Sequence, residues 1–295
     1  MSQGAIERAV TVVEVGPRDG LQNESRSVPT AVKIAFVDAL AAAGLSIVEA
    51  TSFVSPAAVP QLADAEAVML GITRRPGVRY PVLVPNERGY DRAIGVGADA
   101  FAVFAAATEE FSQANVRGSI AETFERFAPI ARRARAAGHW LRGYVSVAFV
   151  CPYHGAVTPR AAVDVSQRLF ELGCQEVALA DTIGRATPAD VAAVLELAAV
   201  SLPIECLALH LHDTAGRAIE NVAVGIAHGV RIFDGAAGGL GGCPFAPGAP
   251  GNLATESLVR YLDEAGYRTG VDVDAIYRAF DRVRAAMGTA DAAEG

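Results

Sequence analysis

The sequence predicts a (β/α)8 TIM barrel, a closed ring of eight parallel strands surrounded by helices, with additional C-terminal helices. Short runs rich in β-branched residues alternate with alanine-rich helical segments along the 295 residues of the chain. Eight such alternations over about 240 residues are typical of this α/β barrel. The strand-like runs lie at 11–15, 46–51, 80–84, 100–105, 142–149, 176–180, 207–211 and 231–234.

Amphipathic segments follow the strands and supply the expected helices. Several begin at Pro, Ser, Thr or Asp and end near Gly44, Gly138 or Gly173, the usual start and stop signals of helices. We therefore predict one domain over 1–295, with the barrel at about 10–250 and a C-terminal helical addition at about 251–288. The clearest helical segments are 31–43, 57–70, 121–137, 161–172 and 188–200, followed by about 253–265 and 273–287.

A doubly wound open sheet is the alternative fold. Such a sheet normally has a glycine-rich turn between its first strand and first helix. The first turn here reads Glu14-Val15-Gly16-Pro17-Arg18, which lacks that pattern. The barrel is therefore favoured.

Composition limits the partners and the location. A net charge of -8 disfavours a nucleic-acid partner, so an anionic substrate must be captured by a local basic pocket. Apolar runs such as 144–150 are far shorter than a membrane span. The first nine residues lack an apolar signal core, and the first strand begins near Val10, which leaves no room for a presequence. Four scattered cysteines without a CxxC pair favour reduced thiols and a cytoplasmic protein.

Lysine usage bears on the mechanism. Lys33 is the only lysine among 25 basic residues. A Schiff-base mechanism would have to use this residue, yet it lies in the helical segment 31–43 and not at a strand end. Amine catalysis is therefore disfavoured.

Polar residues gather where the predicted strands end, which is where a barrel of this kind has its active site. Asp19 follows the first strand, and the seventh strand ends in His210-Leu211-His212. Residues two apart on a strand point to the same face, here into the barrel. Together with Asp19, these histidines form a nitrogen–nitrogen–oxygen set that suits a catalytic divalent metal. The alternative is two histidines held by hydrogen bonds at a strand end.

Arg18 and Glu49 are expected to pair beside this set. The planar guanidinium of Arg18 could hold a carboxylate or a developing enolate oxygen, the alternative being a surface ion pair. Glu49 lies inside an apolar strand, and a buried carboxylate needs a partner, for which Arg18 on the neighbouring strand is the natural candidate. The sequence is equally compatible with a structural and a catalytic role for Glu49.

The loop after the eighth strand is rich in glycine and carries a cysteine. Its sequence is Gly238-Gly239-Leu240-Gly241-Gly242-Cys243-Pro244. Flanking glycines allow such a loop to close over a substrate, and Cys243 could then exchange a proton with the reacting carbon. Asn252, near the start of the next helix, is most simply an N-cap on sequence grounds alone.

At these residues the chain resembles the 3-hydroxy-3-methylglutaryl-CoA lyase family of the DRE-TIM metallolyase superfamily. The likeness extends from about residue 10 to about residue 270, and its first segment and its glycine-cysteine loop are highly specific. The matching segments are 14–24, 48–56, 142–146, 151–153, 181–184, 210–214 and 239–256.

The resemblance implies a metal-dependent carbon–carbon lyase acting on an acyl-CoA. Loss of the hydroxyl proton of the substrate would break the C2–C3 bond and give acetoacetate and the enolate of acetyl-CoA. The cofactor would be Mg2+ or Mn2+. Its implied ligands, among which Asn252 becomes a ligand and not only a cap, are Asp19, His210, His212 and Asn252.

Further roles follow from the same resemblance. Arg18 would stabilise the enolate oxygen, Glu49 would orient Arg18, and Cys243 would transfer a proton. The implied substrate-binding or supporting positions are Gln22, Ser52 and Asp181. Self-association into a homo-oligomer is also expected by analogy with the family.

The chain departs from the family pattern at a few positions, which leaves the acyl branch open. Small residues at 236–238 and at Ala215, where relatives are often bulkier, could enlarge the acyl pocket and admit a longer branch such as an isohexenyl group. His154 also replaces a glutamate in the Cys-Pro-Tyr-Glu-Gly segment. Two other functions remain as alternatives. A Claisen-condensing synthase shares the metal barrel but usually has a long C-terminal extension, and a non-catalytic barrel could serve as a scaffold.

Overall fold

The computed structural model describes residues 8–241 and 251–288. Its main sheet runs in the order β2-β1-β11-β10-β9-β6-β5-β4-β3, and every neighbouring pair is parallel. The strands are β1 (Thr11–Glu14), β2 (Ile47–Val48), β3 (Thr51–Ser52), β4 (Val82–Leu83), β5 (Ala100–Ala106), β6 (Trp140–Ser146), β9 (Glu176–Asp181), β10 (Leu207–Leu211) and β11 (Ile232–Gly235).

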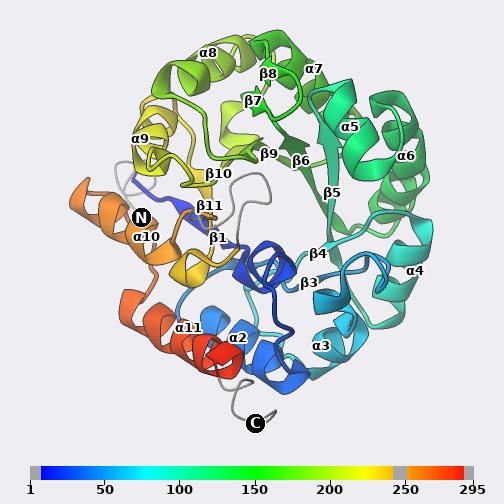
Figure 1. Cartoon of the computed structure of the whole chain (residues 1–295), viewed down its shortest axis with the longest axis vertical. Coiled ribbons are helices and arrows are strands. Elements are labelled where there is room, and N and C mark those ends of the chain that lie inside the picture. Colours follow the sequence, from blue (N-terminus) through cyan, green and yellow to red (C-terminus); the bar gives the residue numbers. More distant parts are fainter. Residues whose placement is uncertain (1–7, 242–250, 289–295) are drawn as a thin grey trace.

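The sheet closes on itself because β2 and β3 are two parts of one strand. Glu49 and Ala50 lie between them and bond to both sides. The Glu49 amide donates to the Glu14 carbonyl at 2.8 Å, and the Ala50 amide donates to the Pro81 carbonyl at 2.9 Å. Eight strand positions therefore form the ring seen in Figure 1, and the predicted barrel is confirmed.

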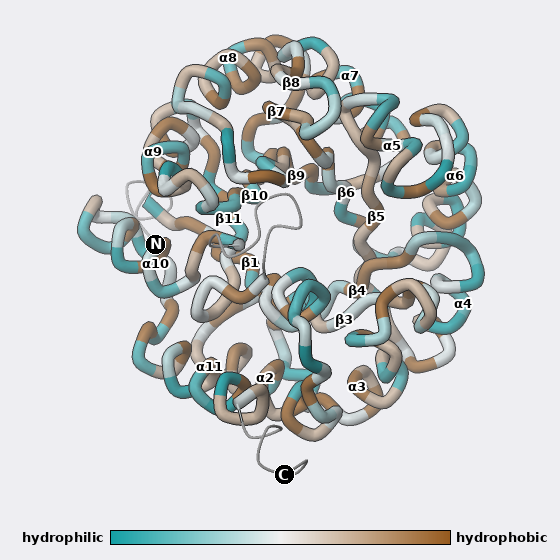
Figure 2. Tube along the Cα trace, viewed as in Figure 1, coloured by the Kyte–Doolittle hydropathy of each residue, from teal (hydrophilic) through white to brown (hydrophobic). Residues whose placement is uncertain are grey.

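Helices surround the ring on all sides (Figure 1). Figure 2 shows hydrophobic and hydrophilic residues alternating along them, as expected of helices with one buried side. The helices are α2 (Thr30–Ala42), α3 (Ala65–Gly71), α4 (Glu87–Gly95), α5 (Glu109–Val116), α6 (Ile120–Ala136), α7 (Pro159–Leu172), α8 (Pro188–Ala198), α9 (Ala218–Ala227), α10 (Thr255–Glu264) and α11 (Val273–Gly288). A short hairpin, β7 (Val150–Cys151) and β8 (Gly155–Ala156), follows β6.

Local signals set several helix ends. The Ser119 side chain and that of Glu122 form a capping box at the start of α6. Helix α8 begins with Pro188 after the capping residue Thr187. Helix α7 ends at Gly173, whose φ of 118° is in the left-handed region. These ends match the starts and stops predicted from the sequence.

The helix predicted over 57–70 is wrong in its first half. The structure has a 3-10 turn over Pro60–Leu62 and then α3 over Ala65–Gly71. Pro60 has no amide hydrogen, and Val59 before it has a φ of -136° and a ψ of 82°, outside the helical region, so a helix cannot run through this point. Helices α4, α5 and α9 follow β4, β5 and β10, where the alternation of strands and helices predicts a helix.

Both predicted C-terminal helices are present. Helix α10 contacts β1 and β11, and so covers the eighth strand of the ring. Helix α11 packs against α2 and against α10. Within residues 8–241 and 251–288, every helix is too short or too polar to span a bilayer.

Small residues inside the barrel leave room for two large polar ones. Ala102 on β5 and Ala178 on β9 are fully buried. In the strand register, Ala102 is paired with Arg142 on β6, and Ala178 is paired with Tyr144 on the same strand. Arg142 and Tyr144 are two apart on β6 and therefore share the inner face. The interior of this barrel consequently holds charge as well as apolar packing.

Candidate metal-dependent active site

A turn of π-helix after β1 (η1, Gly16–Gly20) carries Arg18 and Asp19. The Val15 carbonyl accepts hydrogen bonds from the amides of Arg18, Asp19 and Gly20 at 3.1, 2.7 and 3.2 Å. Pro17 at the start of the turn supplies no amide and fixes φ, which favours this sharp entry. Such turns are frequent at functional sites, and here one presents two charged side chains at the end of the first strand.

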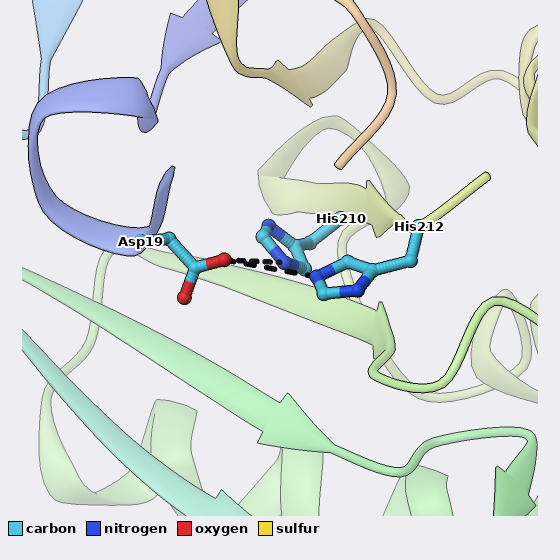
Figure 3. A group of neighbouring side chains, drawn as sticks. All are labelled: Asp19, His210 and His212. Carbon is cyan, nitrogen blue, oxygen red and sulfur yellow. Dashed lines mark ion pairs between the residues drawn. The ribbon is translucent and has the colours of Figure 1, made fainter. Parts of the chain in front are cut away.

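Asp19, His210 and His212 converge near the ends of β1 and β10 (Figure 3). Oδ2 of Asp19 lies 3.9 Å from Nε2 of His210 and 3.7 Å from Nε2 of His212. One ligand atom from each residue fits within 4.8 Å of the others, and both histidines are buried. Two nitrogens and one oxygen at this spacing fit a divalent cation, as predicted from the His-x-His pattern.

The charge on Asp19 suits this role. Burial disfavours ionisation of its carboxyl, but the Arg18 guanidinium and the two histidines outweigh burial and hold its pKa well below the usual range. The residue therefore stays anionic, as a hard-cation ligand must.

Asn252 is not the N-cap that its sequence position suggests, because that place is taken by Ala254. The backbone of Asn252 forms a bridge with His212, and its side chain turns into the site. Its Nδ2 donates to Oδ2 of Asp19 at 2.9 Å and to the Leu240 carbonyl at 3.0 Å. The structure therefore brings all four implied ligands together, although ligation by Asn252 requires its amide oxygen at this position.

Arg18 and Glu49 form the predicted buried pair. Nε and Nη2 of Arg18 donate to the two carboxylate oxygens of Glu49 at 2.9 and 3.3 Å, while Nη1 bonds to Asp19. Tyr144 donates its hydroxyl to Glu49, and its ring lies 5.4 Å from the guanidinium carbon of Arg18. The carboxylates raise the pKa of Arg18 despite its burial, so the cation is permanent and fixed in orientation.

A second buried pair, which the sequence interpretation missed, supports His210. Oδ2 of Asp234 lies 3.0 Å from Nδ1 of His210. Arg142 donates from Nη2 to Oδ1 of Asp234 at 2.6 Å. The Nε of Arg142 lies 2.7 Å from a carboxylate oxygen of Glu176. The signal was available, since Arg142 and Asp234 are charged residues within strand runs, as is Glu49.

A cavity of about 660 Å3 opens over these residues. Its described lining includes Arg18, Asp19, Gln22 and both histidines, together with apolar residues of neighbouring loops and helices. Because Arg18 and Asp19 face one space, a substrate could meet the cation and the metal ligands together.

Of the three residues predicted to bind or support the substrate, Asp181 and Ser52 form hydrogen bonds within the protein. Gln22 lines the cavity. Asp181 accepts from the amides of Arg185 and Ala186 at 3.0 and 2.9 Å, and burial raises its pKa. The Ser52 hydroxyl lies 3.3 Å from the Leu83 carbonyl and donates to it. Among the described residues, neither Ser52 nor Asp181 belongs to the cavity lining.

The loop cysteine Cys243 lies outside the described residues. The small residues thought to enlarge the acyl pocket can be placed, however. Ala236 and Ala237 are fully buried. The described lining of the cavity contains none of the four small residues Ala215, Ala236, Ala237 and Gly238. These positions therefore give no support for a larger acyl pocket.

Comparison with known proteins agrees with this geometry. A family model described as HMGL-like matches residues 9–283. The chain is 49% identical to hydroxymethylglutaryl-CoA lyase from Pseudomonas mevalonii, over 96% of this chain and 94% of that protein. The solved HMG-CoA lyase from Brucella melitensis is 52% identical, with a TM-score of 0.93 over 94% of this chain and 98% of that one.

A further solved relative was determined as a complex with ligands. It is an HMG-CoA lyase from Acinetobacter baumannii in complex with coenzyme A and 3-methylmalate, 38% identical, with a TM-score of 0.91 over 98% of this chain and 93% of that one. The family model and these relatives all cover nearly the whole chain. The chain therefore belongs to the 3-hydroxy-3-methylglutaryl-CoA lyase family.

Proposed function

We propose that this chain cleaves 3-hydroxy-3-methylglutaryl-CoA to acetyl-CoA and acetoacetate with the help of Mg2+ or Mn2+. The observation that carries the proposal is the convergence of Asp19, His210 and His212 beside Arg18 in one cavity. The high identity to hydroxymethylglutaryl-CoA lyases over nearly the full chain supports the same reaction. A solved relative that contains coenzyme A supports an acyl-CoA substrate.

The cation would be held by Asp19, His210, His212 and Asn252. When bound, it supplies a Lewis acid that favours loss of the proton from the tertiary hydroxyl of the substrate. The donor set fits this chemistry because three of the four side chains already face one point and one of them is anionic. The Asp19 carboxylate and the amide oxygen of Asn252 are oxygen ligands of the kind that suits both Mg2+ and Mn2+.

Arg18 is proposed to stabilise the enolate. Cleavage of the C2–C3 bond leaves the electron pair on the acetyl-CoA fragment, and its negative charge collects on the thioester oxygen. A guanidinium already fixed by Glu49 and Tyr144 needs little reorganisation to bind that oxygen. Glu49 thus acts through Arg18 and not on the substrate itself.

Cys243 is proposed to deliver the proton that converts the enolate carbon to the methyl group of acetyl-CoA. This role rests on the family resemblance. Gln22 is proposed to contact the substrate because it lines the cavity. Ser52 and Asp181 are proposed to support the site, Asp181 by holding the turn after β9.

A homo-oligomeric state and a cytoplasmic location remain part of the proposal. The location rests on the four cysteines, three of which are free thiols in the described part of the chain. The oligomeric state rests on the family resemblance.

Turnover against a panel of acyl-CoA esters tests the proposed substrate. The panel contains 3-hydroxy-3-methylglutaryl-CoA, an isohexenyl analogue, and acetyl-CoA with a 2-keto acid. We expect the methyl-branched ester to give the highest kcat/KM. A higher kcat/KM for the isohexenyl ester would assign the longer branch, and condensation without cleavage would assign a synthase. Absence of turnover with every substrate would favour a scaffold.

A further inference from the structure

Glu14, the last residue of β1, is a fully buried carboxyl group that takes no part in the proposed reaction. Its Oε1 accepts hydrogen bonds from the amides of Gly16 at 2.8 Å and Ala237 at 2.9 Å. Its Oε2 accepts from the Thr255 hydroxyl at 2.6 Å. No arginine, lysine or histidine in the described part of the chain forms an ion pair with it. A buried carboxyl without a cation is costly, so its three bonds need an explanation.

The three partners of Glu14 belong to three separate segments of the candidate metal site. Gly16 begins the π-turn that presents Asp19. Thr255 lies three residues after Asn252 and begins α10. Ala237 lies in the turn that leads from β11 to Leu240, whose carbonyl accepts from the Asn252 amide. One carboxyl group therefore joins the segments that carry two of the four implied ligands.

A second buried carboxyl, that of Glu256, binds the next amide of the same turn. Both oxygens of Glu256 lie 3.0 Å from the amide nitrogen of Gly238, the residue after Ala237. Gly238 has a φ of 66°, and an added Cβ would lie 2.4 Å from the ring of Phe280. The turn is thus fixed by two consecutive amides, each bound to a different carboxyl, at a position that only glycine fits.

The turn in question is packed directly against the segment of Asp19. A Cβ added at Gly20 would lie 2.7 Å from Cβ of Leu240, so the two backbones approach closely. The Gly241 amide also donates to Glu24 at 3.3 Å. A shift of residues 236–241 would therefore move Asn252 and the π-turn relative to each other.

We propose that Glu14 is a positioning residue for the metal centre, which sets the spacing between Asp19 and Asn252 by joining the π-turn, the 236–241 turn and the start of α10. Glu256 assists by fixing the 236–241 turn. This inference rests on the proposed metal-dependent function, because it takes Asp19 and Asn252 as ligands.

Glutamine is the conservative replacement for Glu14, because it can form the same three hydrogen bonds. Burial raises the pKa of Glu14 to about 8, against the three hydrogen bonds that lower it, and the nearby Glu256 adds to the increase. When the carboxyl is protonated, Oε1 still accepts from the two amides, while the bond to Thr255 reverses, so that Glu14 donates and the Thr255 hydroxyl accepts. Glutamine has the same shape and the same donor and acceptor, whereas alanine has neither and aspartate is too short.

Mn2+ affinity, measured by calorimetric titration without substrate, tests the proposal. In Glu14→Ala and Glu14→Asp we expect the Kd for Mn2+ to rise roughly ten- to a hundredfold, the range known for the loss of groups that hold metal ligands in place. In Glu14→Gln we expect a Kd close to that of the wild type. Leu195→Ala serves as the control, because Leu195 is fully buried on α8, away from the site, and its loss destabilises the fold alone.

The outcomes separate this inference from the proposed function. If the wild type binds no Mn2+, the proposed metal centre itself fails. If the wild type binds Mn2+ and Glu14→Ala binds it equally well, or no more weakly than Leu195→Ala, Glu14 has no positioning role. Should Glu14→Ala not fold, Thr255→Val removes the α10 connection alone. It should raise the Kd severalfold, and an unchanged value would overturn the proposal.

Discussion

Nδ1 of His210 lies 3.0 Å from Oδ2 of Asp234, and this contact fixes how the ring faces the candidate metal site. A carboxylate can only accept, so Nδ1 donates to Asp234, and Nε2, which lies 3.9 Å from Oδ2 of Asp19, is the nitrogen that faces the candidate metal site. Nδ1 of His212, by contrast, is buried and has no hydrogen-bond partner in the described part of the chain. The two histidines are therefore not equivalent, and His210 is the one held in advance.

Asp234→Asn should weaken metal binding. The amide cannot supply the negative charge that selects the Nδ1-protonated form of His210, and it leaves Arg142 with one fewer carboxylate. We expect the Kd for Mn2+ to rise about ten- to a hundredfold, measured by calorimetric titration. Asp213→Asn is the matched control, since Asp213 follows His212 but its carboxylate accepts from the Ala218 amide. Equal affinities in the two variants would argue against the role of Asp234.

Arg18→Lys should lower kcat for acyl-CoA cleavage by about a hundred- to a thousandfold. Lysine keeps the charge but cannot hold both oxygens of Glu49 and still present a fixed donor to the enolate. Steady-state kinetics with 3-hydroxy-3-methylglutaryl-CoA provides the measurement.

Arg92→Lys is the control for this substitution. Arg92 makes the same two-pronged contact, with Glu66 at 2.6 and 2.8 Å, but outside the cavity. Loss of such a half-exposed pair should change kcat little. Similar losses of activity in both variants would show that the arginine–carboxylate geometry matters only for the fold.

The stability of the wild type should fall relative to Glu14→Gln as the pH rises toward 8. The pKa of Glu14 is about 8 in the folded protein, above its ordinary value of 4.5. The stabilisation linked to this group is therefore complete below about pH 4.5 and is lost as the pH rises through about 8. The nearby charge of Glu256 also raises the pKa of Glu14, and Glu256 is present in both proteins.

Urea unfolding of both proteins at a series of pH values measures this difference. We expect the free energy of unfolding of the wild type, minus that of Glu14→Gln, to decrease steadily from about pH 5 to pH 8 and then to level off. A difference that stays constant over this interval would mean that Glu14 has an ordinary pKa in the folded protein.

The barrel and the ligand set were predictable because each has a short-range signal. Alternating runs set the order of strands and helices, and the spacing of His210 and His212 on one strand sets their common direction. The pair of Arg18 and Glu49 also followed from local reasoning, since a carboxylate inside an apolar strand requires a partner.

The features that the sequence analysis did not predict have two origins. The break at Pro60 was a local signal that was overlooked. The role of Glu14 could not be predicted, because its partners Ala237 and Thr255 are 223 and 241 residues away. Asp234 and Arg142 could each be recognised as a charged residue within a strand that needs a partner, but they are 92 residues apart, and only the closed barrel shows that they pair with each other. Contacts of this kind depend on tertiary register, which no single segment encodes.

The central claim is tested most directly by cleavage of 3-hydroxy-3-methylglutaryl-CoA before and after removal of metal. We expect equal amounts of acetyl-CoA and acetoacetate from the wild type, loss of turnover after treatment with a chelator, and recovery on addition of Mg2+ or Mn2+. Asp19→Ala and His210→Ala should remain inactive when metal is restored. Undiminished cleavage in chelator, or in these two variants, would contradict the account.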